Sequence, residues 1–254
     1  MTFPVVFHIL GHPIAAHEIC EMSGYVVGVL TYVGIKRRNE SPRTNDTKFW
    51  IIVWCVLGAM IGAKALAWVE MSPEEMADLH SWADFLGGKT IVGGLLGGWI
   101  AVEAAKKYFG VSERTGDQYV VGLVLGIAIG RVGCFLEGLP DHTYGVATSL
   151  PWGVDFGDGI RRHPTQLYEI AFVLAWGGIV WVRSAWPHAR GDLFRLFMLG
   201  YFSFRLLVEF IKPVYRPGGL SAIQWACVLG IAMSVHGLIK KPRFAAAEVQ
   251  HVAG

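Results

Sequence analysis

The amino-acid sequence predicts an all-α membrane protein, a polytopic helical bundle of about seven transmembrane helices with the N-terminus outside the cell and the C-terminus inside. Three observations predict it. Of the 254 residues, 53% are hydrophobic and 17% are charged, whereas ordinary soluble domains carry roughly 25% charged residues. The mean hydropathy is +0.43. Seven apolar stretches are each long enough to cross a bilayer core, which takes about 20 helical residues.

The seven predicted spans follow one another along the chain. They cover residues 14–35, 49–69, 85–105, 119–138, 165–183, 192–211 and 220–239. The segment before them, 1–13, lacks the basic start and cleavage pattern of a signal peptide, so it is assigned to the mature chain. Nothing in the sequence resembles a soluble domain, and we predict a single membrane domain over residues 1–254.

Polar or helix-breaking residues delimit each span. The junctions are 36–48, 70–84, 106–118, 139–164, 183–191 and 212–219. Pro164 suits the first turn of the fifth span, where proline is tolerated. Tryptophans lie near the ends of several spans, where indole rings favour the membrane interface. The junction 139–164 is the longest, and we expect it to form an extracytoplasmic arm or lid.

Lysine and arginine are distributed unequally between alternate junctions. One set holds thirteen: Lys36, Arg37, Arg38, Arg43, Lys48, Lys106, Lys107, Arg114, Arg183, Arg190, Lys240, Lys241 and Arg243. The opposite set holds four: Arg161, Arg162, Lys212 and Arg216. The positive-inside rule places the richer set in the cytoplasm, and the N-terminus and the 139–164 segment outside.

Composition excludes several classes of partner and site. The net charge of +2 is too small to predict a nucleic-acid partner. The four cysteines are scattered without a CxxC pair, which argues against a disulfide framework and a zinc-type motif. His8, His12 and His17 are too irregularly spaced for a strong metal signal. We therefore expect no metal and no cofactor.

Small residues four apart predict close helix packing in the third and fourth spans. The pairs are Gly93 and Gly97, Gly94 and Gly98, Gly122 and Gly126, and Gly126 and Gly130. Such pairs let helix backbones approach closely in lipid. The two halves of the chain share no glycine or charge pattern, so no inverted transporter repeat is predicted.

Ten of the ionisable residues inside the predicted spans are informative. They are Glu18, Glu21, Lys64, Lys89, Glu103, Arg131, Glu137, Glu169, Arg205 and Glu209. Each such group at a helix centre costs about 2.5–3.5 kcal/mol on insertion scales, so each needs a partner or a function. Internal ion pairs and snorkelling at span ends are the structural alternatives, and the sequence does not specify the partners of Glu18, Glu21, Lys64, Lys89 and Glu103.

Three segments in the outer half combine charges with small or aromatic residues: 130–138, 163–169 and 200–210. In the last of them, Tyr201, Arg205 and Glu209 recur every four residues and share one helical face. One interpretation is a structural Arg–Glu pair steadied by a tyrosine. The other is a phosphate site, because guanidinium groups bind phosphate oxygens in pairs and keep their charge.

These segments carry GRxG, HPxQLYE and GYxxFRxxVEF motifs, which resemble the bacterial phosphatidylglycerol–prolipoprotein diacylglyceryl transferase family. A third span rich in glycine supports the resemblance, which covers roughly residues 85–240. It implies a multi-pass enzyme of the bacterial inner membrane without a cofactor. Its reaction transfers diacylglycerol from phosphatidylglycerol to the lipobox cysteine of an exported prolipoprotein and releases glycerol phosphate.

The resemblance also implies roles for individual residues. The catalytic candidates are Arg131, Arg205, His163, Glu169 and Tyr201. The substrate-binding candidates are Arg131, Gly133, Glu137, Gly138, Gln166, Tyr168 and Glu209, with Gly145 matching a further glycine of the signature. Arg131 would be the arginine that binds the phospholipid phosphate, and Arg205 the second essential arginine.

The chain departs from the family pattern at two positions. Val92 stands where the family has a histidine that is a candidate base, and Cys134 stands where it has an asparagine. With Val92 unable to exchange a proton, His163 or Glu169 is the expected base. Two alternatives stay open: a paralogue that uses phosphatidylglycerol with another acceptor, and a non-catalytic lipid-binding or transport protein.

Overall fold

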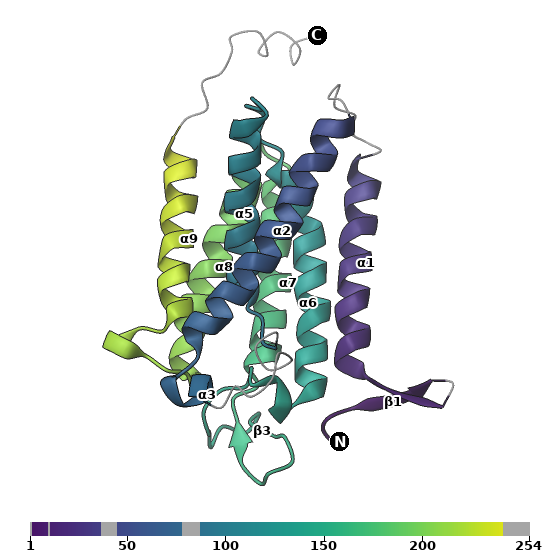
Figure 1. The fold of residues 1–254 in the computed structure, drawn as a ribbon, viewed down its shortest axis with the longest axis vertical. Coiled ribbons are helices and arrows are strands. Elements are labelled where there is room, and N and C mark those ends of the chain that lie inside the picture. Colours follow the sequence, from purple (N-terminus) through teal and green to yellow (C-terminus); the bar gives the residue numbers. More distant parts are fainter. Residues whose placement is uncertain (1, 10, 37–44, 78–86, 241–254) are drawn as a thin grey trace.

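The computed structural model describes residues 2–9, 11–36, 45–77 and 87–240. Seven long helices in these ranges run side by side as a bundle (Figure 1). They are α1 (Ala16–Lys36), α2 (Asn45–Glu70), α5 (Ile91–Tyr108), α6 (Val120–Glu137), α7 (Thr165–Arg183), α8 (Asp192–Val208) and α9 (Ala222–Ile239). The predicted all-α membrane architecture is confirmed.

Five of the seven helices are by themselves long and apolar enough to cross a membrane, namely α1, α2, α6, α7 and α9. The other two are less apolar or shorter. α5 ends in Lys106 and Lys107, and α8 has only 17 residues. α8 lies against α6, α7 and α9, and its side chains form the centre of the core. The number of crossings therefore stays a prediction.

Several helix ends differ from the predicted spans by a few residues, and two of the starts have a local cause. Residues 14 and 15 belong to an antiparallel hairpin of β1 (Val6–Ile9) and β2 (His12–Ala15), so α1 begins two residues later than expected. α5 begins at Ile91 instead of residue 85, because the Thr90 side chain caps it by accepting a hydrogen bond from the Gly93 N–H at 3.1 Å. Residues 85 and 86 lie outside the described ranges.

The predicted glycine packing is confirmed except at Gly130, where nothing lies within 4 Å of an added Cβ, and the structure identifies the partner helices. On α5, an added Cβ would lie 2.3 Å from the Gly62 carbonyl oxygen at Gly93 and 2.2 Å from the Gly58 carbonyl oxygen at Gly97. α2 and α5 therefore touch backbone to backbone. α6 packs on α1 in the same manner, since a Cβ at Gly122 would meet the Gly28 carbonyl oxygen at 3.2 Å.

Short elements cover the end of the bundle that carries the N-terminal hairpin (Figure 1). They are α3 (Pro73–Ala77), η2 (Leu139–Asp141), β3 (Val154–Asp155), β4 (Arg161–Arg162), η3 (Glu209–Ile211) and η4 (Pro217–Gly219). The 139–164 segment therefore lies at the end predicted to face outward. Its role as an arm or lid stays a prediction.

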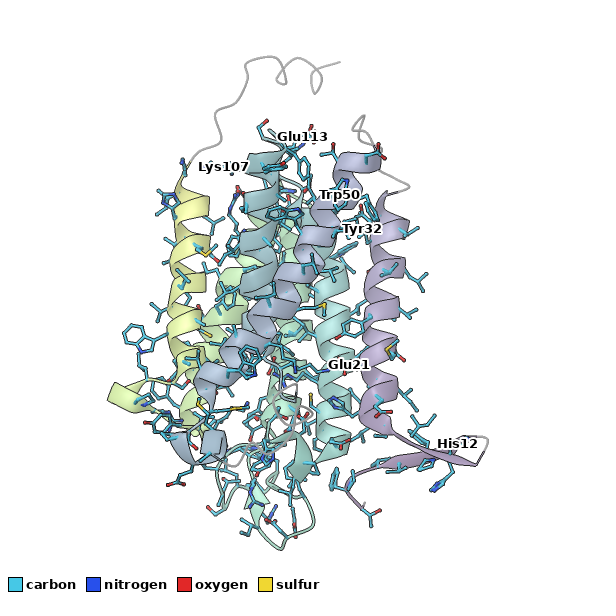
Figure 2. The ribbon with its side chains drawn as sticks, in the orientation of Figure 1. His12, Glu21, Tyr32, Trp50, Lys107 and Glu113 are labelled. Atoms are coloured by element: carbon cyan, nitrogen blue, oxygen red, sulfur yellow. The ribbon has the colours of Figure 1, made fainter. Side chains whose placement is uncertain are left out.

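The described residues of the basic junctions lie at the opposite end, where η1 (Gly116–Tyr119) precedes α6. Figure 2 shows Lys107 and Glu113 there, far from the hairpin residue His12. Five of the thirteen basic residues counted for the cytoplasmic side lie outside the described residues: Arg37, Arg38, Arg43, Lys241 and Arg243. The alternating arrangement agrees with the predicted orientation, which itself stays a prediction.

Candidate active site

A buried carboxylate, Glu169 in the first turns of α7, is the centre of an ion-pair cluster. Its Oε2 lies 2.9 Å from Nε of Arg131 on α6 and 3.1 Å from Nη1 of Arg205 on α8. Its Oε1 accepts a hydrogen bond from the Tyr201 hydroxyl at 2.7 Å. None of the four side chains is more than 6% exposed. Residues of all three motif segments thus meet at one carboxylate.

The α8 face predicted from the spacing is confirmed. Tyr201 and Arg205 both reach Glu169, and Nη2 of Arg205 lies 2.8 Å from Oε2 of Glu209, one turn further on. Glu209 is fully buried at the start of η3. Arg205 therefore lies between two carboxylates, which is the arrangement expected of a structural Arg–Glu pair, while Arg131 shares the first of them.

Arg131 keeps part of its donor capacity free. A guanidinium group has five N–H donors. Arg131 directs Nε at Glu169 and Nη1 at Sγ of Cys134, 3.6 Å away. Among the residues that the structure describes, none provides an acceptor for its Nη2. The unused donors are those that a phosphate oxygen would take.

Other buried polar atoms around the cluster also lack partners within the described part of the chain. Both amide atoms of Gln166 are unpaired although that side chain is 1% exposed, and so are Nε of Arg205 and Oε1 of Glu209. Buried polar groups are normally hydrogen-bonded. Ordered water or a polar ligand can supply the partners that these atoms lack.

Not every predicted site residue reaches the cluster. His163 and Tyr168 pair with each other, with 3.1 Å between Nδ1 and the hydroxyl oxygen, and Trp152 donates to the same hydroxyl at 2.8 Å. Within the 139–164 segment the Gly145 N–H donates to the His163 carbonyl oxygen at 2.8 Å, and the next residue, Val146, joins the segment to the bundle by donating its N–H to the Ile211 carbonyl oxygen at 2.8 Å. Glu137 ends α6 with Oε2 buried and without a described partner.

The two motif glycines have packing roles. A Cβ at Gly133 would lie 3.1 Å from the carbonyl oxygen of His17, so this residue lets α1 approach α6. Gly138 has φ 76°, a backbone conformation that favours glycine, and a Cβ there would lie 2.8 Å from the Phe3 side chain. Their expected part in binding substrate stays a prediction.

Sequence reasoning missed two cations beside the cluster. Lys212 is 5% exposed, and burial, then the charge of Arg205, lowers the pKa of its ammonium group to about 8. Arg216 donates from Nη2 to the carbonyl oxygens of Glu209 and Lys212 at 2.6 and 2.8 Å. Both follow the last predicted residue of the sixth span, so their charge was assigned to a junction.

Partners are found for four of the intramembrane charges whose partners the sequence left open. Lys89 pairs with Glu21, and Lys64 donates to the carbonyl oxygens of Gly87 and Gly88 at 2.9 and 2.8 Å. Glu103 pairs with Lys106 at 3.3 Å on its own helix. These contacts favour the structural interpretation for these residues.

Val92, at the position of the family's histidine, is 1% exposed and packs in the hydrophobic core with Leu96 and Trp99. Its side chain carries no proton that a base could exchange. The valine side chain therefore serves in apolar packing at the position where the family has a candidate base. Proton removal from an acceptor must depend on other groups.

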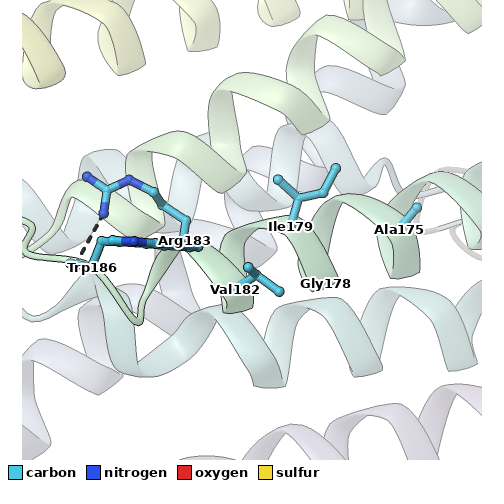
Figure 3. A pocket seen from close by; sticks show the side chains of 6 residues that line it. All are labelled: Ala175, Gly178, Ile179, Val182, Arg183 and Trp186. Atoms are coloured by element: carbon cyan, nitrogen blue, oxygen red, sulfur yellow. Dashed lines mark hydrogen bonds between the residues drawn. The ribbon is translucent and has the colours of Figure 1, made fainter.

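The apolar grooves of the surface lie away from this cluster. The one in Figure 3 follows the outer side of α7 near its C-terminal end, lined by Ala175, Gly178, Ile179, Val182, Arg183 and Trp186. Nη1 of Arg183 donates to the Trp186 carbonyl oxygen at 3.2 Å. Among the residues that line this groove, none belongs to the ion-pair cluster.

Comparison with known proteins identifies the family. The family model of prolipoprotein diacylglyceryl transferase matches residues 4–240. A phosphatidylglycerol–prolipoprotein diacylglyceryl transferase of Bordetella parapertussis is 32% identical over 242 residues, covering 85% of this chain and 87% of its own.

Two further relatives carry the same name. That of Methylobacillus flagellatus is 34% identical over 206 residues, 76% of this chain and 75% of its own. That of Nitrosomonas europaea is 32% identical over 201 residues, 75% of this chain and 70% of its own. This chain is a multi-pass membrane protein that belongs to the prolipoprotein diacylglyceryl transferase family.

Proposed function

We propose that this protein transfers the diacylglyceryl group of phosphatidylglycerol to the cysteine thiol of an exported prolipoprotein, in the bacterial inner membrane. The observation that carries the proposal is the sharing of one buried carboxylate, Glu169, by the guanidinium groups of Arg131 and Arg205. Family membership supports the reaction, and the two buried guanidinium groups support the cluster as the proposed place where the lipid phosphate binds.

The lipid half of the reaction needs stabilisation of a leaving phosphate. The bond between the glycerol carbon of diacylglycerol and the phosphate oxygen breaks, and glycerol phosphate leaves with the electron pair. The free donors of Arg131 and the nearby cation of Lys212 would accept that negative charge in a site with little water. Glu169 holds both guanidinium groups in place before the lipid arrives, so little reorganisation is needed during the reaction.

The acceptor half needs a proton acceptor. The sulfur of the cysteine forms a thioether bond to the freed carbon and loses its proton, whose unperturbed pKa is near 8.5. Glu169 is occupied by two arginines and a tyrosine. His163 has one ring nitrogen against Tyr168 and is half-buried at the predicted outer end. We therefore favour His163 over Glu169 as the base.

Complementation in cells depleted of their own transferase tests the proposal most directly. The expected result is growth together with diacylglycerol-modified lipoprotein. In parallel, the purified protein should release glycerol phosphate from phosphatidylglycerol only when a lipobox peptide is present. Release with cell extract but not with that peptide would indicate a paralogue with another acceptor. Lipid binding without any release would indicate a non-catalytic carrier.

A further inference from the structure

A second cluster of reactive side chains lies one turn of α6 away from the ion-pair cluster. His17 of α1, Cys134 of α6 and Asp141 of η2 each present one ligand atom, and these atoms lie within 4.8 Å of one another. Nδ1 of His17 is 3.7 Å from Oδ1 of Asp141. The three side chains come from three elements and are brought together only by the fold.

We propose that His17, Cys134 and Asp141 bind a thiophilic divalent metal ion of the zinc class. Imidazole nitrogen, thiolate sulfur and carboxylate oxygen are the ligand types that zinc uses, at about 2.0–2.3 Å from the metal. Ligand atoms around such an ion lie about 3.5 Å apart by tetrahedral geometry. The observed separations need side-chain shifts of about an ångström to reach it.

A built outer shell around His17 supports the proposal. Ligating histidines usually direct their second ring nitrogen at a carboxylate, which fixes the ring. Nε2 of His17 lies 3.8 Å from Oε2 of Glu21. Glu21 is itself held, since Lys89 and the Tyr25 hydroxyl bind its other oxygen, the latter at 2.7 Å. Figure 2 shows Glu21 in the half of the bundle nearer the hairpin.

Neighbouring side chains also contact the other two proposed ligands, Asp141 and Cys134. The Thr143 hydroxyl donates to Oδ2 of Asp141, which leaves Oδ1 directed at His17. Nη1 of Arg131 lies 3.6 Å from Sγ of Cys134, so the sulfur is held beside a guanidinium group that also contacts Glu169. Gly133 permits the approach of His17, because a Cβ there would meet its backbone at 3.1 Å.

The proposed site has three protein ligands and therefore an open fourth position. Nδ1 of His17 is buried and makes no hydrogen bond within the described residues, so it is available as a ligand. Zinc sites with three protein ligands bind a water or a substrate in the fourth position. The metal ion would be separated from Glu169 only by the Arg131 side chain, which contacts both Cys134 and Glu169.

The open position would assist His163, the proposed base, in place of the histidine missing at position 92, a consequence that rests on the proposed function. An acceptor thiol that coordinates the metal ion would pass its proton more readily to His163 and stay bound as thiolate. Its sulfur can then attack the lipid carbon while Arg131 holds the phosphate. A chain with valine at position 92 would in this way not need a histidine there.

Metal binding can be measured without reference to transfer. The purified full-length protein in detergent micelles is stripped with a chelator, reloaded with zinc, and passed through a desalting column before elemental analysis. About one zinc per chain is expected. Loading with cobalt instead should give a thiolate-to-cobalt charge-transfer band. Cys134→Ser should abolish that band, and His17→Gln should weaken zinc binding at least tenfold.

Cys55→Ser is the matched control, because Cys55 is half-buried on α2 and outside the cluster. It should bind zinc and give the cobalt band as the unmodified protein does. Absence of the cobalt band from the unmodified protein would overturn the proposal, as would equal zinc content in Cys134→Ser and the unmodified protein. Zinc binding without any diacylglyceryl transfer would leave the site standing and count against the proposed function.

Discussion

At the scale of residues, two arginines of the ion-pair cluster share one carboxylate group, that of Glu169. Glu169 pairs with Arg131 and Arg205, and within the described part of the chain only the second of these arginines has another carboxylate, Glu209. Breaking a buried ion pair by removing one partner typically costs about 3–5 kcal/mol, because a buried charge is left uncompensated. Substitutions at Glu169 therefore combine loss of stability with loss of function, whereas conservative changes of the arginines separate the two.

We expect Arg131→Lys to abolish transfer while the protein remains folded. Lysine keeps the charge and can still pair with Glu169, but it loses the planar fork that binds two phosphate oxygens at once. The measurement is release of glycerol phosphate from phosphatidylglycerol, with the melting temperature in detergent as the check on folding. We expect at least a hundredfold loss, the size of effect seen when one such donor is removed.

Arg183→Lys is the matched control, since Arg183 lies at the other end of α7 and binds only the Trp186 and Pro187 carbonyls among the described contacts. It should keep full activity. If Arg131→Lys retains full phosphatidylglycerol binding and turnover, the arginine does not bind the lipid phosphate.

We expect the ammonium group of Lys212 to make the affinity for phosphatidylglycerol depend on pH. Burial lowers the pKa of its ammonium group to about 8, so the charged form dominates below that pH and is lost above it. An anionic phosphate nearby favours the charged form. Affinity for phosphatidylglycerol should therefore be steady below pH 8 and fall by up to tenfold per unit above it. Lys212→Met should bind more weakly at pH 7 and show no such fall, and a decline of the same slope in that variant would assign the titration to another group.

At the scale of elements, glycine spacing predicts which helix faces pack closely but not which helix each face packs against. Only the pairs on α5 and α6 were identified from the sequence, although the partner glycines Gly58 and Gly62 on α2 are also four residues apart. Helix ends were readable to within a few residues. The exception is α5, whose start depends on the capping hydroxyl of Thr90, a local contact that hydropathy does not report.

Gly97→Ala should destabilise the protein, because its new Cβ would lie 2.2 Å from the Gly58 carbonyl oxygen and force α2 and α5 apart. Overpacking of this kind costs about 1–3 kcal/mol. Gly130→Ala is the control, since nothing lies within 4 Å of a Cβ there. Thermal unfolding in detergent checks both. Equal melting temperatures for the two variants would show that the backbone contact is not tight.

The candidate site was predicted as three separate segments, and their convergence at Glu169 follows from α6, α7 and α8 being neighbours. Spacing within one helix is enough to align Tyr201, Arg205 and Glu209. Spacing says nothing about residues that meet across helices or loops. His17, Cys134 and Asp141 are therefore invisible in the sequence as a group, and only the close approach of α1 and α6 assembles them.

At the scale of the whole molecule, the ion-pair cluster lies near one end of the bundle and the described basic junctions lie at the other. The motif residues of α7 lie in its first turns, on the side of the hairpin and the 139–164 segment. Lys107 and Glu113 mark the opposite end. An exported prolipoprotein would reach the site from outside the cell. The proposed function therefore requires the predicted orientation, in which the end that carries the site faces outward.

Labelling of single cysteines tests that orientation. Ser149 and Ser184 are both exposed, the first in the 139–164 segment and the second in the basic 183–191 junction. Replacing either by cysteine changes one atom. In spheroplasts, an impermeant maleimide should label Ser149→Cys from outside and Ser184→Cys only after the membrane is opened, because lysine and arginine keep the second junction in the cytoplasm.

The unmodified protein controls for its own cysteines, two of which are buried and two partly buried inside helices. Labelling of Ser184→Cys from outside, with Ser149→Cys protected, would invert the bundle, place the ion-pair cluster on the cytoplasmic side, and thereby separate it from any exported acceptor.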